Sequence, residues 1–149
     1  VKSKDVALCA EAARTLGILC FDEKGKAEAL DGGAIPLLVS LLGEANAKIA
    51  KIYSTLAIMA ITSTVTGRIQ MHSPEAVKAL SNLMNQDDRT LRLNTLKVIT
   101  NIAVYPPIRS LLLEDVGMIK LIERLRDESG DKLLEKHSSL SLDAINWKP

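Results

Sequence analysis

The stretch that decides the fold is Gly33-Ala-Ile-Pro-Leu-Leu-Val-Ser-Leu-Leu42, because two later stretches repeat its pattern. They are EAVKALSNLM at 75–84 and GMIKLIERLR at 117–126, each 42 residues after the one before. In the first copy, apolar side chains at positions i, i+3, i+6 and i+7 lie on one face of a helix. The three stretches are therefore predicted to be amphipathic helices of a repeating unit.

The sequence around these copies repeats as well. A short helix is predicted directly before each copy, at 25–30, 67–72 and 109–114. Gly32-Gly33 and Ser73-Pro74-Glu75 carry the turn and helix-start signals between the short helix and the next one. A longer amphipathic helix is predicted to close each unit, and one more opens the chain; these long helices lie at 5–20, 47–61, 89–104 and 132–146.

This order of helices predicts an all-α fold, a right-handed α-solenoid in which stacked units share one core. The chain is expected to form a single domain over 1–149 with about 3.5 repeats. Its parts are the third helix of a truncated repeat at 1–22 and three units at 25–62, 67–104 and 109–147. Breaks are expected at 22–25, at 62–67 and at Tyr105-Pro106-Pro107.

The first helix is expected to have an uncovered apolar face. The chain starts at Val1 rather than Met, inside a repeat, which we interpret as a piece of a longer protein. The face of Val6, Ala10, Ala13 and Leu16 would then meet an earlier unit. Where nothing covers it, we expect this face to mediate self-association.

Composition excludes several classes of partner. The 149 residues carry a formal charge of +1, and 47% are hydrophobic but only 3% aromatic. A nearly neutral chain with few aromatic rings is not suited to nucleic acid, and no apolar run is long enough to span a membrane. Cys9 and Cys20 lie about 16 Å apart in one helix, too far for a disulfide. They are interpreted as small buried side chains in the cytosol or nucleus.

Groups for catalysis, metal binding or cofactor binding are not apparent in the sequence. His72 and His137 are isolated, with no Cys or carboxylate at a ligand spacing, so no metal site is expected. Gly32-Gly33 follows no strand and precedes no Gly-Lys-Ser/Thr, so it is not a phosphate loop. The protein is therefore predicted not to be an enzyme and to need no cofactor.

The repeat resembles the armadillo family. Gly33–Leu42, preceded by Ala29-Leu30-Asp31-Gly32, is similar to that family's second helix, and Ala12–Leu19 is similar to its third helix. A narrower resemblance links 92–97, 75–84 and 144–149 to radial spoke head proteins built from armadillo repeats, which belong to the axoneme of motile cilia and flagella. It implies a structural scaffold that binds other radial spoke subunits, with a cytoplasmic location in the axoneme.

The armadillo resemblance also implies a concave groove lined by the third helices. In peptide-binding members an Asn on each of these helices holds an extended peptide, and a Trp one turn earlier adds side-chain pockets. Here Asn101 is kept, whereas Ile18, Ile58 and Ala144 take its place elsewhere; the positions one turn earlier are Arg14, Ser54, Lys97 and Leu140. A single asparagine cannot pair the successive backbone groups of an extended peptide, so capture of a basic nuclear-localisation peptide is not expected.

The same face predicts which residues bind the partner. The predicted groove residues are Glu11 and His137 together with the main candidates, Arg14, Lys51, Ser54, Asn94, Lys97 and Asn101. Residues 32–104 carry 7 − 4 = +3 charges, which favours an acidic partner segment. In the alternative interpretation, Lys48, Lys51, Arg89, Arg92 and Lys97 form an ordinary solvated helix face.

Two functions remain open from the sequence. The first is a non-catalytic scaffold that docks protein partners in the axoneme. The second is a transport or signalling adaptor that binds an extended peptide in the groove.

Overall fold

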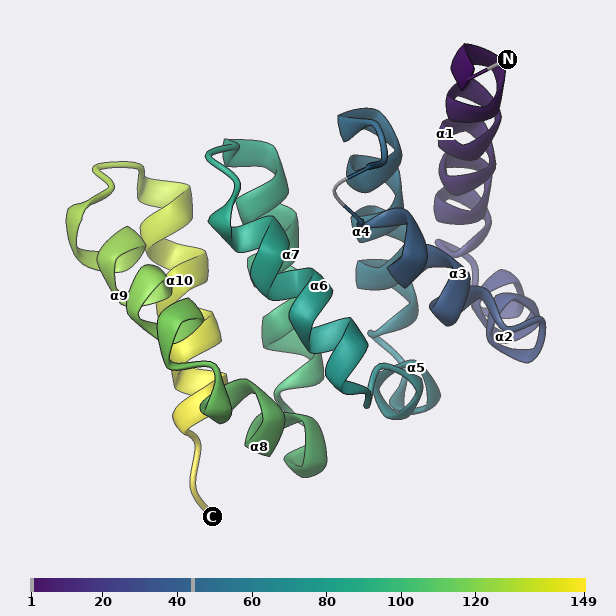
Figure 1. The fold of residues 1–149 in the computed structure, drawn as a ribbon. Coiled ribbons are helices and arrows are strands. Elements are labelled where there is room, and N and C mark those ends of the chain that lie inside the picture. Colours follow the sequence, from purple (N-terminus) through teal and green to yellow (C-terminus); the bar gives the residue numbers. More distant parts are fainter. Residues whose placement is uncertain (1, 44) are drawn as a thin grey trace.

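The computed structural model describes residues 2–43 and 45–149, and only the backbone of residues 2–4. Within these ranges the chain forms ten α-helices and no strand (Figure 1). Successive groups of helices stack side by side from the N-terminus to the C-terminus. The predicted all-α solenoid is confirmed.

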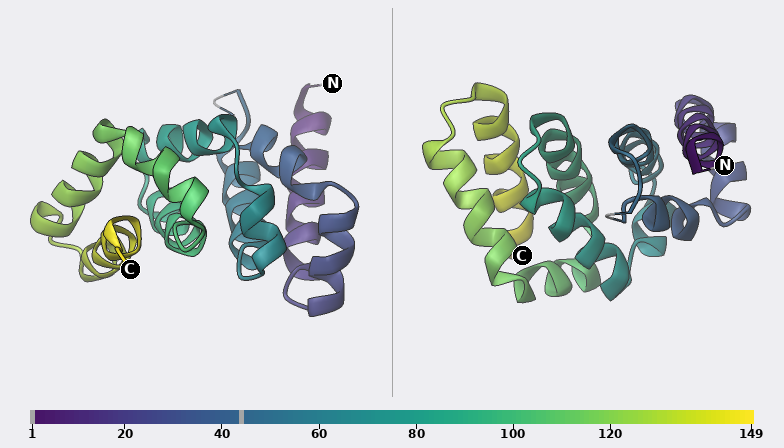
Figure 2. Two further views of the ribbon diagram at one scale, coloured as in Figure 1. Left: turned by 90° about the horizontal axis from the view of Figure 1, so that it is seen from below. Right: turned by 45° about the horizontal axis from the view of Figure 1, so that its top comes forward.

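Each complete unit has two shorter helices followed by a long one; the predicted order of short, medium and long helix holds in the second and third units, but in the first α3 is one residue shorter than α2. The long helices lie next to one another in a row, α1 on α4, α4 on α7 and α7 on α10. Figure 2 shows this row on the inner side of the bent solenoid, with α3, α6 and α9 on the outer side. The bounds are α1 Lys2–Leu19, α2 Glu23–Asp31, α3 Ala34–Leu41, α4 Lys48–Ile61, α5 Val65–Gln70, α6 Pro74–Asn85, α7 Arg89–Ile102, α8 Pro106–Glu114, α9 Val116–Glu128 and α10 Lys132–Asn146.

Local signals in the sequence set most of the helix starts. The Ser73 hydroxyl accepts a hydrogen bond from the Ala76 amide at 3.1 Å, and Pro74 occupies the first turn of α6 as predicted. Gly33 has a φ of 73° at the start of α3, a conformation that favours glycine. The break predicted at Tyr105-Pro106-Pro107 lies two residues earlier, at 103–105, because α7 ends at Ile102 and α8 begins at Pro106. Proline loses no helical hydrogen bond in a first turn.

Two arginines fasten the ends of long helices to the short helices that follow. Arg68 donates to the carbonyl oxygens of Thr62 at 3.0 Å and Ser63 at 3.1 Å. Arg109 donates in the same way to Ala103 at 2.9 Å and Val104 at 3.3 Å. These carbonyls lie at or just after the ends of α4 and α7, where a cation interacts favourably with the helix dipole.

The repeat spacing is not constant. The long helices α4, α7 and α10 begin at Lys48, Arg89 and Lys132, so the spacings are 89 − 48 = 41 and 132 − 89 = 43 residues. Between α1 and α4 the spacing, measured from the last residue of each helix, is 61 − 19 = 42 residues. The two ends are equivalent, because in both cases the carbonyl oxygen of the last residue lies against a glycine at the third position of the following helix. These offsets define which positions of the four long helices are equivalent.

The prediction for the uncovered face of the first helix was wrong. Ala10 and Ala13 are buried and Leu16 packs against the core, because α1 turns these residues toward α4. Small side chains favour this close approach, and a β-carbon at Gly17 would lie only 3.8 Å from the Tyr53 carbonyl oxygen. The exposed side of α1 instead carries Leu8, which is 70% exposed, and Leu19, which is 53% exposed.

Both cysteines are free thiols. Cys20 is fully buried at the end of α1, and burial raises the pKa of its thiol. Cys9 is half-buried. A buried thiol with a raised pKa is a weak nucleophile, in agreement with the packing role predicted for Cys20.

Candidate functional site

The candidate site is the inner surface of the row of long helices. When the four long helices are aligned by their ends, three positions of each helix are equivalent on this surface. We call these twelve residues the long-helix face. Its three rows are Glu11, Tyr53, Asn94 and His137; Arg14, Leu56, Lys97 and Leu140; and Ile18, Ala60, Asn101 and Ala144.

Three of the six main candidates are accessible on this face. They are Arg14, Lys97 and Asn101, and Glu11 and His137 lie there too; Asn94 is in register with them but is buried, at 7% exposed. They come from α1, α7 and α10, for which the alignment predicted from the sequence matches the alignment of the observed helices.

Lys51 and Ser54 lie elsewhere, inside the protein. Lys51 is 6% exposed, and its Nζ lies 3.5 Å from Oε1 of Gln86. Ser54 is fully buried, and within the described residues its hydroxyl has no hydrogen-bond partner. The sequence register had aligned α4 with α7 at 43 residues instead of 41, which shifts every α4 position by two. We therefore leave both residues out of the proposed surface.

In place of Lys51 and Ser54, α4 contributes Tyr53 and Leu56, which are both half-buried. The sequence does not mark these two residues, because the connections between helices differ in length from unit to unit. One available signal is the pair of basic residues that open α4 and α7, Lys48 and Arg89, which lie 41 residues apart.

The two asparagines of α7 bind α4. Asn101 donates through Nδ2 to the Met59 carbonyl oxygen at 3.1 Å and to the Thr62 hydroxyl at 3.2 Å. Asn94 is buried, and its Nδ2 lies 3.4 Å from the Thr55 hydroxyl. An amide group has two N–H donors, so both donors of Asn101 are already used within the fold. A bound peptide could receive a hydrogen bond from Asn101 only if one of these contacts broke.

The charges on the long-helix face are mostly balanced. Arg14 Nε donates to both carboxylate oxygens of Glu11 at 3.1 Å, and this hydrogen bonding lowers the pKa of Glu11. Burial, followed by the charges of Lys97 and Lys136, lowers the pKa of His137, so its ring is neutral at neutral pH. None of the ion pairs among the described residues includes Lys97. Lys97 is therefore the cation of this face that a partner's carboxylate can reach.

Most of the other basic residues of the middle segment are held by internal contacts; Lys78, which is exposed on α6, is an exception. Lys48 pairs with Asp88, and Arg89 pairs with Asp131, with its Nη2 3.2 Å from Oδ1. Each pair joins the first residue of one long helix to the N-cap aspartate of the next, and we call these two pairs the clasps.

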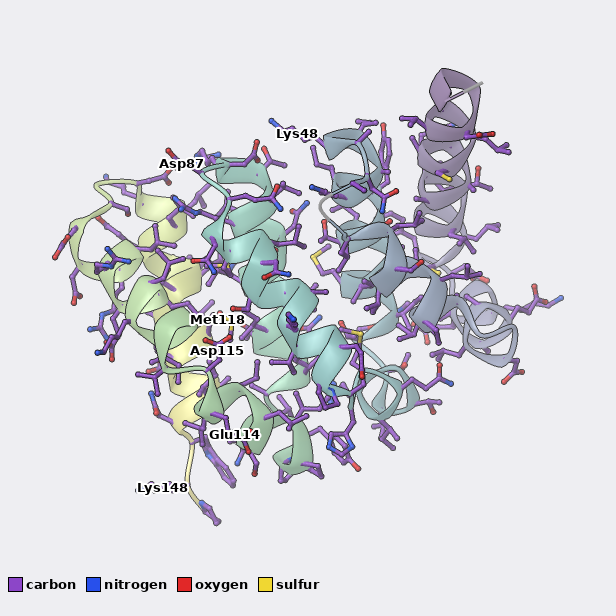
Figure 3. The ribbon with its side chains drawn as sticks, viewed as in Figure 1. Lys48, Asp87, Glu114, Asp115, Met118 and Lys148 are labelled. Atoms are coloured by element: carbon purple, nitrogen blue, oxygen red, sulfur yellow. The ribbon has the colours of Figure 1, made fainter. Side chains whose placement is uncertain are left out.

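Arg92 is held in the same region. It contacts Asp87 at 3.0 Å and the Met84 carbonyl oxygen at 3.0 Å. Lys48 and Asp87 are labelled near the upper ends of α4 and α7 in Figure 3, which is the end of the helices where these contacts gather. Because most of its cations are paired internally, the +3 charge of residues 32–104 does not form a continuous basic patch.

The long-helix face exposes both polar and apolar side chains. Glu11 and Arg14 are exposed, Ile18 is 55% exposed and Leu140 is 42% exposed, and α4 adds the half-buried Tyr53 and Leu56. Accessible apolar side chains beside polar ones are typical of surfaces that bind other proteins.

Neither a metal site nor a membrane span is found in the described part of the chain. No group of three or more His, Cys, Asp or Glu residues there could hold a metal ion. No helix there is long and apolar enough to cross a bilayer.

Known structures share the fold. A designed armadillo repeat protein in complex with the peptide (KR)4 superposes with a TM-score of 0.79 at 21% identity, over 92% of this chain and 57% of that one. Computationally designed armadillo repeat proteins for modular peptide recognition give a TM-score of 0.81 at 19% identity, over 93% of this chain and 58% of that one. The chain thus spans a little over half of these proteins. At this identity the likeness shows the armadillo-type fold. No protein-family model matches the chain, and no curated protein matches it.

Proposed function

We propose that this protein is a non-catalytic scaffold that binds a protein partner through the long-helix face. The observation that carries the proposal is the set of accessible apolar side chains on the long-helix face, the exposed Ile18 and Leu140 and the half-buried Tyr53 and Leu56, together with Lys97, which is in none of the ion pairs of the described residues. Apolar contact area supplies most of the binding energy in protein interfaces, and one available cation adds selectivity for a partner with a carboxylate.

A folded partner fits this face better than an extended peptide. An extended chain leaves its own N–H and C=O groups unpaired, so it needs a series of donors and acceptors on the receptor. Asn101 has no free N–H donor, and the equivalent positions on the other long helices are Ile18, Ala60 and Ala144. A folded partner satisfies its own backbone and needs only a complementary surface.

The alternative is an adaptor for an extended peptide; two of the structures with the same fold are named for peptide binding or peptide recognition. Lys97 favours an acidic peptide under this alternative. The adaptor predicts that an isolated acidic peptide binds the chain and that Asn101→Ala removes binding. The scaffold predicts no binding of such a peptide, measured by fluorescence anisotropy.

We further propose that the partner belongs to the axoneme, as a radial spoke subunit. This finer proposal rests on the sequence resemblance of 75–84, 92–97 and 144–149 to radial spoke head proteins with armadillo repeats. The scaffold proposal does not depend on it.

A co-sedimentation experiment tests both proposals. The chain is mixed with salt-extracted axonemes from motile cilia and sedimented, and the pelleted fraction is measured. We expect the chain to pellet and the double variant Ile18→Glu/Leu140→Glu to remain in solution, because two charges would be placed among the accessible apolar side chains. Val116→Glu is the control, since Val116 is 57% exposed on α9, away from this face.

The outcomes separate the two proposals. A chain that does not pellet contradicts the axonemal assignment. Pelleting that is equal for the double variant and the control contradicts the long-helix face as the binding surface. Circular dichroism of all three proteins verifies that the substitutions leave the helices intact.

A further inference from the structure

A pocket lies beside the long-helix face, between the C-terminal ends of α7 and α10. Its volume is about 390 Å³, within the range of small-ligand sites. One wall is formed by Val104, directly after α7, and by Arg109 of α8; the other is formed by Asp143, Ala144 and Trp147 at the end of α10. We call these five residues the Trp147 pocket. Because Ala144 also belongs to the long-helix face, a partner bound to this face can reach the pocket.

The pocket is open because the contact between α7 and α10 lacks an amide that the contact between α4 and α7 has. On α7, Asn101 reaches across to α4 and donates to the Met59 carbonyl oxygen at 3.1 Å. The equivalent residue on α10 is Ala144, whose methyl group leaves the corresponding space beside α7 unfilled. On the opposite wall, Val104 takes the place that Ser63 has one unit earlier. The same location is therefore polar and bridged between α4 and α7, but apolar and open between α7 and α10.

The exposure of Trp147 is shared by the equivalent residue of every earlier unit. Trp147 is 56% exposed, and its three equivalents after the other long helices, Phe21, Ser63 and Val104, are exposed as well. Each of these three is followed by a complete unit that leaves it uncovered. The repeat thus keeps this position at the surface, and Trp147 places the largest of the four side chains there.

Arg109 holds the indole of Trp147 in position. The guanidinium carbon lies 5.1 Å from the centre of the indole ring, in a cation–π contact. The three nitrogens of Arg109 donate to the carbonyl oxygens of Ala103 at 2.9 Å, Val104 at 3.3 Å and Trp147 at 3.2 Å. Because the ring and the cation are already ordered by these contacts, little entropy is lost at this wall when a ligand binds.

The charges of the pocket favour a neutral occupant. Arg109 supplies a fixed positive charge, and Asp143 is an exposed carboxylate that is in none of the ion pairs of the described residues. For a charged side chain, attraction to one of these groups is offset by repulsion from the other, while the cost of leaving water remains. An aromatic ring avoids this cost. It can stack on the indole and contact the apolar side chains of Val104 and Ala144.

We propose that the Trp147 pocket binds an aromatic side chain of the protein partner. This inference rests on the proposed function and names the chemistry that the partner must present: a tyrosine, tryptophan or phenylalanine that projects toward the C-terminal ends of α7 and α10. The hydroxyl of a tyrosine can also donate a hydrogen bond to Asp143. Aromatic anchors that fill a pocket supply a large share of the binding energy of an interface.

Titration with p-cresol, the side chain of tyrosine, tests the pocket by NMR without a partner. Trp147 is the single tryptophan of the sequence, so its indole N–H gives one resonance that reports on this site. We expect p-cresol to shift this resonance with a dissociation constant on the order of 1 mM, as is typical of so small a ligand. The probes n-butylammonium and propionate, which represent the charged side chains of lysine and glutamate, should bind at least about 10-fold more weakly.

Ala144→Asn is the variant that fills the pocket. Its amide would occupy the space that Asn101 occupies one unit earlier, and we expect it to weaken p-cresol binding by about 10-fold or more. Ala27→Asn is the matched control, because Ala27 is exposed on α2 and the same substitution there should leave the affinity unchanged. Circular dichroism verifies that both variants are folded.

Four results would overturn the proposal. The first is an indole resonance that p-cresol does not shift, and the second is an equal affinity for p-cresol in the two variants. The third is tighter binding of n-butylammonium or propionate than of p-cresol, which would assign the pocket to a charged side chain. The fourth is equal pelleting of Ala144→Asn and Ala27→Asn in the co-sedimentation experiment. In that case the partner does not use the pocket, whereas pelleting of the wild type would still support the scaffold.

Discussion

The two ends of the row of long helices are held together by different forces. The side of α1 that meets α4 includes the small residues Ala10, Ala13 and Gly17, and the side-chain hydrogen bonds of the described residues include none between these two helices. The α7–α10 contact adds a polar network, in which the Ser141 hydroxyl lies 2.9 Å from both the Thr100 hydroxyl and the Leu96 carbonyl oxygen. It also has a clasp, between Arg89 and Asp131.

The difference shows that long helices of the same repeat type can be joined to their neighbours in two ways, by apolar packing or by directional polar contacts. Apolar packing of small residues depends on the distance between helices and sets their orientation only weakly. Hydrogen bonds and ion pairs have directions, so they fix how α10 is aligned with α7. We expect the N-terminal contact to be sensitive to side-chain size and the C-terminal contact to be sensitive to polar substitutions and to pH.

The largest expected effect is a change of size at the N-terminal contact. Gly17→Leu would force bulk into a space where a β-carbon already lies 3.8 Å from the Tyr53 carbonyl oxygen. Overpacking of this kind costs about 1–3 kcal/mol. Hydrogen exchange should show lost protection in α1 while α7 and α10 keep theirs.

Ala7→Leu provides the control for this experiment, because Ala7 is exposed on the same helix. Equal protection of α1 in the two variants would contradict a size-limited contact.

A smaller effect is expected from a pair of serines in α10. Ser141→Ala removes a hydroxyl with two hydrogen-bonding contacts and should lower the free energy of unfolding by about 1 kcal/mol. Ser138→Ala is the matched variant: Ser138 is just as buried, but its hydroxyl has no partner within the described residues. Its removal should leave stability unchanged or raise it. Urea unfolding measures both, and equal losses would contradict a role for the Ser141 network.

The smallest effect is the pH dependence of the clasps. Hydrogen bonds from Lys48 and Arg89 lower the pKa of Asp88 and of Asp131. A carboxylate with a lowered pKa stabilises the fold above the pKa it has when unfolded, and this contribution is lost as pH falls through the folded value. The thermal midpoint should therefore fall between about pH 5 and about pH 2.

Asp131→Asn tests the source of this pH dependence. Asparagine keeps the N-cap hydrogen bonds but not the charge, so the fall in thermal midpoint at acid pH should be smaller than in the wild type. Asp143→Asn serves as control on the same helix, and it should leave the wild-type curve unchanged. A curve for Asp131→Asn that matches this control would show that the clasp does not contribute.

Much of the architecture is visible in the sequence, because apolar periodicity and capping residues act locally. The helix over 132–146 was predicted with its observed bounds, and Ser73 caps α6 as its position before Pro74 indicates. Asn101 was singled out, but its contacts were not. Its partners Met59 and Thr62 lie about 40 residues away, and only the stacking of α7 on α4 brings them close.

The positions of several site residues could not be predicted, because they depend on the spacing between repeats and on contacts between distant residues, which a local sequence pattern does not contain. A difference of two residues between expected and observed spacing moved Lys51 and Ser54 from the surface into the interior. The side of α1 that faces α4 also could not be chosen, since alanines at 10, 12 and 13 lie on both sides of this helix. Which basic residues remain available to a partner follows from the clasps, which join residues 40 or 42 positions apart.

The clasps have a consequence for the curvature of the whole arc. They join neighbouring long helices at their N-terminal ends, whereas Arg68 and Arg109 join the C-terminal ends of α4 and α7 to the short helix of the next unit. Exposed ion pairs weaken as salt screens them, but buried apolar contacts do not. We therefore expect ionic strength to act on the angle between the N-terminal ends of successive long helices and to leave the core unchanged. The two pairs of charges then contribute to the radius of the inner surface, and with it to the width of partner that fits there.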